Sequence, residues 1–190
     1  MALLPGYLLV WATGMGSLAT PPWDLGLLKN VVSFAAGIIL GAAIGAPGEE
    51  IGRRGYLLPR LIDTIGAGPA GLLSGFQHGL WHVPLILLTP YYLSDAPALV
   101  VVPLFLTLLT LSGPIYAYLK LASRSIVPVA LMHHAWNRYW ETLDSATVRT
   151  GDSNLLYLSG ESGILSILML AAICLGLAHR GHFRPRAATN

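Results

Sequence analysis

The feature that most constrains this chain is the spacing of its charges, because Asp, Glu, Lys and Arg leave six long windows empty. The windows cover residues 1–22, 30–48, 64–94, 96–119, 125–137 and 162–179. A helix needs about 20 apolar residues to cross a bilayer, and most of these windows reach or approach that length. Only 11% of the residues are charged and 54% are apolar, whereas roughly a quarter are charged in an average soluble domain. The sequence therefore predicts a polytopic membrane protein, argues against an ordinary soluble domain and excludes a disordered chain.

We expect an all-α, polytopic membrane helix bundle of about six transmembrane helices. It would form a single integral-membrane domain over residues 1–190, with a motif-bearing core at about 30–142. The predicted helices cover residues 3–19, 30–48, 70–92, 97–119, 125–142 and 162–179. A cleaved signal peptide is the alternative for the first of them, because Ser17-Leu18-Ala19 resembles a cleavage site. No basic segment precedes that apolar run, which argues against the alternative.

The basic residues orient the predicted helices, because cytoplasmic loops are enriched in Lys and Arg. With the C-terminal tail in the cytoplasm, eight of the 11 basic residues lie on that side. An even number of helices then puts the N-terminus there as well, and the acidic segment 141–161 becomes an outside loop. The net charge of only +2 provides no basic field for nucleic acid. Because Cys174 is the single cysteine, an internal disulfide framework and a CxxC zinc site are excluded.

Polar clusters at membrane depth need an explanation, because an ionisable residue there costs about 2.5–3.5 kcal/mol. The first cluster is Glu49-Glu50-Ile51-Gly52-Arg53-Arg54, at the end of the second predicted helix. Glu50 and Arg54 are four residues apart, so they share a helix face and can form an ion pair. Glu49 points about 100° away from Glu50. Charges at a helix end often only anchor the helix at the membrane surface, but two adjacent carboxylates are unusual for that role.

Two further clusters lie within predicted helices. His78 and His82 are four residues apart on one face of the third helix, and His133 and Asn137 have the same spacing in the fifth. Buried histidines often only complete hydrogen bonds in a core, and an intramembrane Asn often bridges helices. On the predicted topology, however, His82 lies ~18 Å and His133 ~12 Å from the cytoplasmic face. Both therefore lie in the half of the bundle where Glu49 ends its helix.

Convergence of these groups would assemble a hydrolytic site. A Glu beside a His can hold and deprotonate a water molecule, while a second His and an Asn can donate hydrogen bonds to an oxyanion. A metal site is the alternative, since His78, His82, His133 and a Glu would satisfy zinc. The residues alone leave both possibilities open.

The three motifs together resemble a known family. The order is Glu-Glu-x-x-x-Arg from Glu49, then a His after Gly-Leu-Trp at His82, then His-x-x-x-Asn from His133. This pattern is similar to that of the CPBP (Abi) intramembrane endopeptidases, which include the type II CAAX prenyl protease, or Ras-converting enzyme. The resemblance implies an intramembrane protease of membrane-associated peptides or proteins. Prenylated CAAX proteins are one substrate class of that family, and many prokaryotic relatives act on other membrane peptides.

The resemblance also implies roles for the matching residues. Glu49 would activate water with His82, whereas His133 and Asn137 would stabilise the oxyanion. Glu50 and Arg54 match supporting positions. The family has been described both as metalloprotease and as glutamate-dependent protease, so the resemblance leaves zinc open as a cofactor.

One position departs from the family pattern, and two other function classes compete with proteolysis. The second motif usually reads Phe-x-x-x-His, but His78 stands where Phe is expected; it could serve packing, hydrogen bonding or metal binding. A proton-coupled transporter also places Glu, His and Asn in the membrane, although no paired half-repeats are found. A non-catalytic scaffold or immunity protein could share the fold. We predict an intramembrane endopeptidase cleaving near the cytoplasmic face of a prokaryotic plasma membrane.

Overall fold

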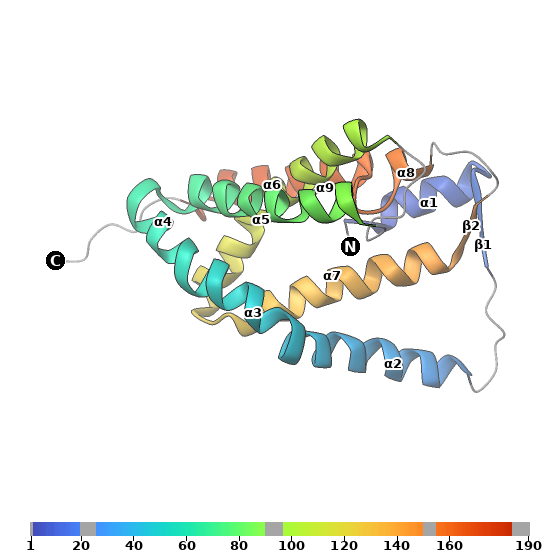
Figure 1. The fold of residues 1–190 in the computed structure, drawn as a ribbon, viewed down its shortest axis with the longest axis horizontal. Coiled ribbons are helices and arrows are strands. Elements are labelled where there is room, and N and C mark those ends of the chain that lie inside the picture. The colour runs from blue at the N-terminus through green and yellow to red at the C-terminus, as the bar shows by residue number, and fades with distance from the viewer. Residues whose placement is uncertain (1, 20–25, 90–96, 150–154, 184–190) are drawn as a thin grey trace.

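The computed structural model describes residues 2–19, 26–89, 97–149 and 155–183, most of which are helical (Figure 1). The elements are α1 (Leu4–Ala12), β1 (Gly16–Leu18), α2 (Gly26–Leu40), η1 (Gly41–Gly45), α3 (Ala46–Glu50), η2 (Ile51–Leu57), α4 (Leu58–Ile65), α5 (Ala67–Leu88), α6 (Ala98–Ser123), α7 (Val127–Ser145), β2 (Thr147–Arg149), α8 (Leu155–Leu158) and α9 (Ile164–His179). The η elements are π-helical. The predicted helical class is therefore confirmed, with one short strand pair added.

Two described segments have the length and apolarity of membrane spans, namely Leu28–Gly45 and Ala98–Ser123. α9 is apolar but shorter. α5 is long enough at 22 residues, but its glutamine and two histidines make it less apolar. Six spans therefore remain a prediction. The end of the predicted span 70–92 and the arginines at 184 and 186 lie outside the described residues.

The first predicted span, residues 3–19, is wrong as a continuous helix. α1 contains nine residues, which rise only about 14 Å against a hydrocarbon core of about 30 Å. After a turn the chain forms β1, which pairs antiparallel with β2 so that Leu18 lies opposite Thr147. The Trp11 indole also donates a hydrogen bond to the Thr147 hydroxyl at 3.1 Å. These contacts with a distant segment hold residues 16–18 in extended conformation despite their apolar sequence.

α5 and α6 pack closely because small residues line their contact. A Cβ at Gly71 would lie 2.6 Å from Pro114 Cα, and one at Gly113 would lie 3.0 Å from Gly75 Cα. In a membrane the lipid tails are themselves apolar, so the hydrophobic effect contributes little to association between helices. Close backbone packing of this kind is then a main source of helix association. Leu58 of α4 packs into the same region with Ala70 and Ala117. This rigid pair fixes the position of α5, which carries both histidines of the second motif.

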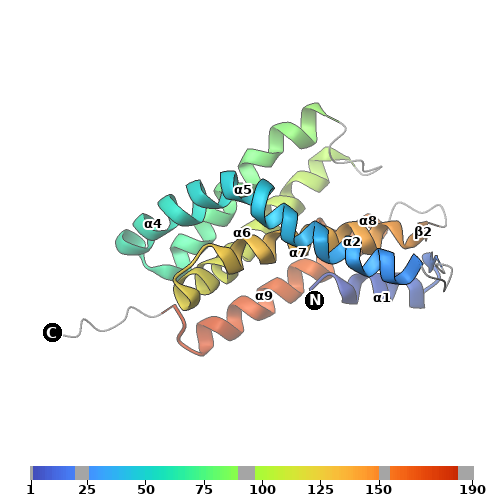
Figure 2. The same ribbon diagram turned by 90° about the horizontal axis from the view of Figure 1, so that it is seen from below.

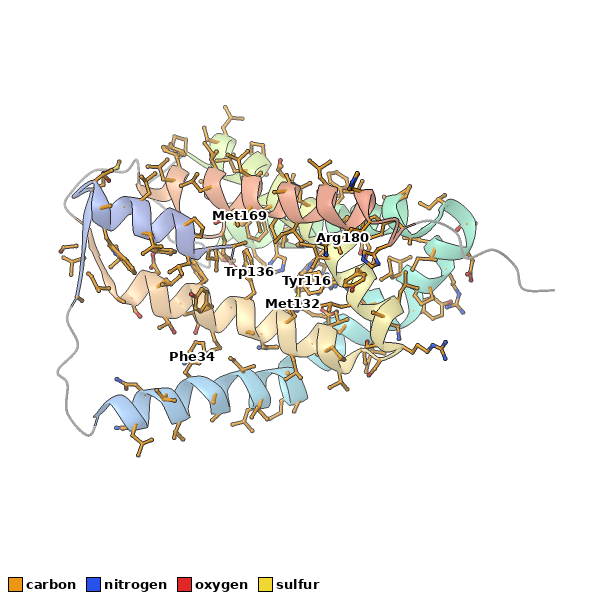
Figure 3. The ribbon with its side chains drawn as sticks, turned by 180° about the vertical axis from the view of Figure 1, so that it is seen from behind. Phe34, Tyr116, Met132, Trp136, Met169 and Arg180 are labelled. Carbon is orange, nitrogen blue, oxygen red and sulfur yellow. The ribbon has the colours of Figure 1, made fainter. Side chains whose placement is uncertain are left out.

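α2 is arranged differently, because it lies beside α7 on the other side of the bundle and buries little of its surface (Figures 1 and 2). None of the residues of its span Leu28–Gly45 is buried. Large side chains such as Leu28, Val31 and Ile39 are exposed, as expected for a helix that faces lipid. A cavity of about 660 Å³ separates α2 from α7, and Phe34 lies in it (Figure 3).

Candidate active site

The acidic motif lies on a long helical run from α2 to α4, in which η1 and η2 flank the short helix α3. Each π-helical turn accommodates an extra residue, and such turns recur at functional sites. Glu49 and Glu50 end α3, and Arg53 and Arg54 follow in η2. The two glutamates therefore enter the bundle in different directions from one short segment.

Glu50 is buried in a network of partners. Its side chain is 0% exposed, and that of Arg54 is 1% exposed. Arg54 Nη1 donates to Glu50 Oε1 at 2.8 Å, and His133 Nδ1 lies 2.9 Å from the same oxygen. The Arg54 guanidinium also lies 4.4 Å from the centre of the Tyr116 ring. A buried charge is tolerated only with such compensation. Glu50 therefore joins α3 to η2 and α7, and Arg54 extends the network to α6.

Glu49 has a different environment. Its side chain is 34% exposed and pairs with Arg53. Glu49 Oε2 lies 3.7 Å from His78 Nε2 on α5. This carboxylate therefore faces the second motif and retains access to water.

His78 and His82 are linked to each other and to the acidic motif. Their Nε2 atoms lie 3.2 Å apart, and Arg54 Nη2 lies 3.4 Å from His78 Nδ1. Because Arg is only a donor, His78 Nδ1 must accept and, in the neutral ring, Nε2 must carry the hydrogen. That hydrogen is then donated to His82 Nε2, which faces the Glu49 side of the site.

The same three side chains have the spacing of a metal site, because Glu49, His78 and His82 each offer a ligand atom and these atoms lie within 4.8 Å of one another. The donor chemistry is less suitable. A ligating His78 would need a lone pair on Nε2, whereas Arg54 favours hydrogen on that atom. Arg53 also pairs with Glu49. The residues as arranged therefore do not fit a divalent metal ion, and His133, the third sequence candidate, is bonded to Glu50.

A cavity of about 310 Å³ adjoins these groups, and His82, His133 and Asn137 line it. His78 also contributes to its wall, and Glu49, which does not line the cavity, lies behind this wall with its Oε2 3.7 Å from His78 Nε2. The cavity continues between α6, α7 and α9, where Tyr116, Met132 and Trp136 lie (Figure 3). The structure thus places three of the four predicted catalytic residues on a cavity of ligand-binding size, and the fourth, Glu49, lies next to its histidines.

Sequence reasoning missed Glu161, which it assigned to an outside loop. The residue precedes α9 and lines the same cavity as the histidines. Burial raises the pKa of the Glu161 carboxyl to about 7, and a hydrogen bond from Trp136 acts in the opposite direction. Nothing in the local sequence, Ser159-Gly160-Glu161-Ser162, distinguishes it from a solvated turn.

Comparison with known proteins agrees with the motif pattern. A family model described as type II CAAX prenyl endopeptidase, Rce1-like, matches residues 31–139. This match covers more than half of the chain and includes all three motifs. Comparisons with curated proteins and with solved structures found no match.

Proposed function

The chain belongs to the Rce1-like type II CAAX prenyl endopeptidase family, a family of integral-membrane proteases, and from this premise we propose that it hydrolyses peptide bonds of membrane-associated substrates with Glu49 as general base. The observation that carries the proposal is the convergence of Glu49, His78 and His82 within 4.8 Å, with both histidines lining a cavity that His133 and Asn137 also line. We place the cut near the cytoplasmic face of a prokaryotic plasma membrane, with both termini in the cytoplasm.

In the proposed reaction, a water molecule is held by the Glu49 carboxylate and lies beside His82, whose Nε2 already accepts the hydrogen of His78 Nε2. Glu49 takes a proton from the water as the water oxygen bonds to the scissile carbonyl carbon. His78 holds its hydrogen on Nε2 because Arg54 faces Nδ1, so it orients His82 and Glu49 rather than accepting the proton. The carbon–nitrogen bond then breaks, and the proton on Glu49 passes to the leaving amine.

His133 and Asn137 are proposed to stabilise the negative charge on the carbonyl oxygen. His133 donates its Nδ1 hydrogen to Glu50, since a carboxylate is only an acceptor. Its Nε2 therefore remains for the cavity and, when protonated, donates to the oxyanion beside the Asn137 amide. Glu50 holds the His133 ring in place through this hydrogen bond, and Arg54 holds Glu50. Glu50 and Arg54 thus act as positioning residues.

We propose that the reaction needs no metal ion. Glu49, His78 and His82 would be the residues to hold zinc, which would supply a Lewis acid and a bound hydroxide. The hydrogen on His78 Nε2 and the two neighbouring arginines oppose that role. Water activation by the Glu49 carboxylate beside these histidines needs no lone pair on His78 Nε2.

The proposal is tested by a survey of peptide termini in host membranes. Cells expressing the wild-type protein are compared with cells expressing Glu49→Gln at the same level. New termini that depend on wild type would support proteolysis and identify the substrate. The survey is repeated with purified protein and a peptide library. Equal termini for wild type and Glu49→Gln in both experiments, with both proteins folded, would contradict the proposal.

A further inference from the structure

The active-site cavity extends well beyond the catalytic residues, along one face of α7. His133, Trp136, Asn137, Trp140 and Glu141 all line it, and their spacing follows the helical repeat. Trp136 and Glu141 lie about 5 Å and 12 Å beyond His133 along the helix axis. The cavity therefore has a catalytic end and a distal end.

The distal end has aromatic walls and a carboxylate. Trp136 and Trp140 share a face of α7, and Glu161 reaches the cavity from the turn before α9. Aromatic faces attract cations through their electron density, and a carboxylate attracts them directly. This combination suits a positively charged group better than an apolar or an anionic one.

The turn that carries Glu161 is held in place. Gly160 has a φ of +81°, which favours glycine, and a Cβ there would lie 3.4 Å from Trp140 Nε1. Ser166 Oγ donates to the Gly160 carbonyl at 3.1 Å, and the backbone N–H of Gly163 donates to the same carbonyl at 3.2 Å. These contacts fix Glu161 against α7 before any substrate enters.

Among the described residues, Glu161 has no cationic partner, unlike the other glutamates of the site. Glu49 and Glu50 each pair with an arginine, and Glu141 pairs with Arg138. Within the described ranges no ion pair includes Glu161. Its hydrogen bond from Trp136 uses one of about four acceptor positions on the carboxylate. A substrate cation would complete this site and favour the ionised form of the carboxyl.

We infer that Glu161, with Trp136 and Trp140, forms a subsite that receives a Lys or Arg side chain of the substrate. The inference rests on the proposed function, and it names the substrate class of that same site. An extended peptide covers about 3.3–3.6 Å per residue. The charged residue therefore lies within about three residues of the scissile bond.

The test uses the purified full-length protein in lipid nanodiscs with a library of decapeptides. Each peptide carries one lysine, or its neutral analogue norleucine, at a different position. At one position, we expect wild type to cleave the lysine peptide about tenfold faster than its norleucine analogue. One charged hydrogen bond or cation–aromatic contact contributes about this much. Glu161→Gln should reduce this ratio to about one. Asp63→Asn, on the exposed side of α4, is the charge-matched control and should retain it.

Two further measurements keep the inference testable. Acetyl-lysine in place of lysine, assayed with wild type alone, should remove the preference even if Glu161→Gln does not fold. Peptide binding to Glu49→Gln, followed by thermophoresis, tests the subsite without cleavage. A lysine peptide should bind about tenfold more tightly than its norleucine analogue, and Glu161→Gln should abolish the difference in this background.

The outcomes separate the two proposals. Absence of cleavage by wild type together with selective binding of lysine peptides would reject the protease and retain the subsite. Cleavage with equal rates for lysine and norleucine at every position would retain the protease and reject the subsite. A lysine preference that persists in Glu161→Gln would also reject the assignment to Glu161.

Discussion

The two faces of the helical segment 49–54 place the same pair of residue types, a Glu and an Arg, in different environments. On the cavity face, Glu49 is 34% exposed and pairs with Arg53. On the core face, Glu50 is 0% exposed and pairs with Arg54, with His133 on the same oxygen. Both pairs have the i, i+4 spacing, so local geometry does not separate them. The surroundings do, because only the cavity face leaves a carboxylate free to meet water and a peptide bond.

The comparison is most strongly tested by Glu49→Gln, which removes the general base while preserving shape. We expect kcat to fall by about 10³-fold, within the range for loss of acid–base catalysis. The melting temperature should stay near that of wild type, because Glu49 is partly exposed. Peptide cleavage and thermal unfolding in nanodiscs measure the two effects, and Asp63→Asn controls for loss of one negative charge. Retained activity would remove Glu49 from the mechanism.

Glu50→Gln should affect stability instead. It leaves Arg54 buried without its counter-ion and weakens the bond to His133, and breaking a buried pair costs about 3–5 kcal/mol. A loss of activity should follow, since His133 would no longer be held. Chemical denaturation of the purified protein measures the stability. An unfolding free energy equal to that of wild type would contradict the structural role of the core face.

Replacing His78 tests the link between the two faces. His78→Phe restores the residue that the family motif usually carries at this position, and it removes the contacts to Arg54 and His82. We expect activity to remain within about tenfold of wild type, because one neutral hydrogen bond contributes about 1 kcal/mol. Complete loss of activity, recovered in His78→Asn or by added zinc, would instead make His78 an essential donor or ligand.

Arg53→Met compares the two arginines directly. Arg53 itself is only 10% exposed, but Glu49 is 34% exposed, so the carboxylate left behind meets water and loss of the pair should cost only about 1 kcal/mol. Arg54→Met is the matched variant on the core face, and it should cost several times more. Denaturation of both variants under identical conditions gives the difference. Equal losses would mean that the two faces are equally buried in the membrane.

The smallest expected effect is that of metal removal. Dialysis against EDTA, followed by assay in metal-free buffer, should leave the cleavage rate unchanged under the proposed mechanism. The control is re-addition of zinc to the dialysed protein, which should also have no stimulating effect. Loss of activity with EDTA and recovery with zinc would replace the carboxylate–imidazole mechanism with one through Glu49, His78 and His82.

Features that depend only on neighbours along one helix could be predicted from the amino-acid sequence. The i, i+4 spacing predicts that Glu50 and Arg54 can pair and that His78 and His82 share a face, and the structure has both contacts. The helical rotation of about 100° per residue predicts that Glu49 points away from Glu50. The uncharged windows likewise predicted a helical protein, because apolar length is also a local property.

Contacts between residues that are far apart in the chain could not be predicted in this way, because they form only when the helices pack. Glu50 meets His133, which is 83 residues away in the chain, and Arg54 meets His78, which is 24 away. Which carboxylate becomes buried depends on these contacts. The same holds for residues 16–18, which pair with β2 instead of continuing a helix, and for Glu161, which enters the cavity. Spacing along a helix is fixed by backbone geometry, whereas burial and partnership arise only when helices pack.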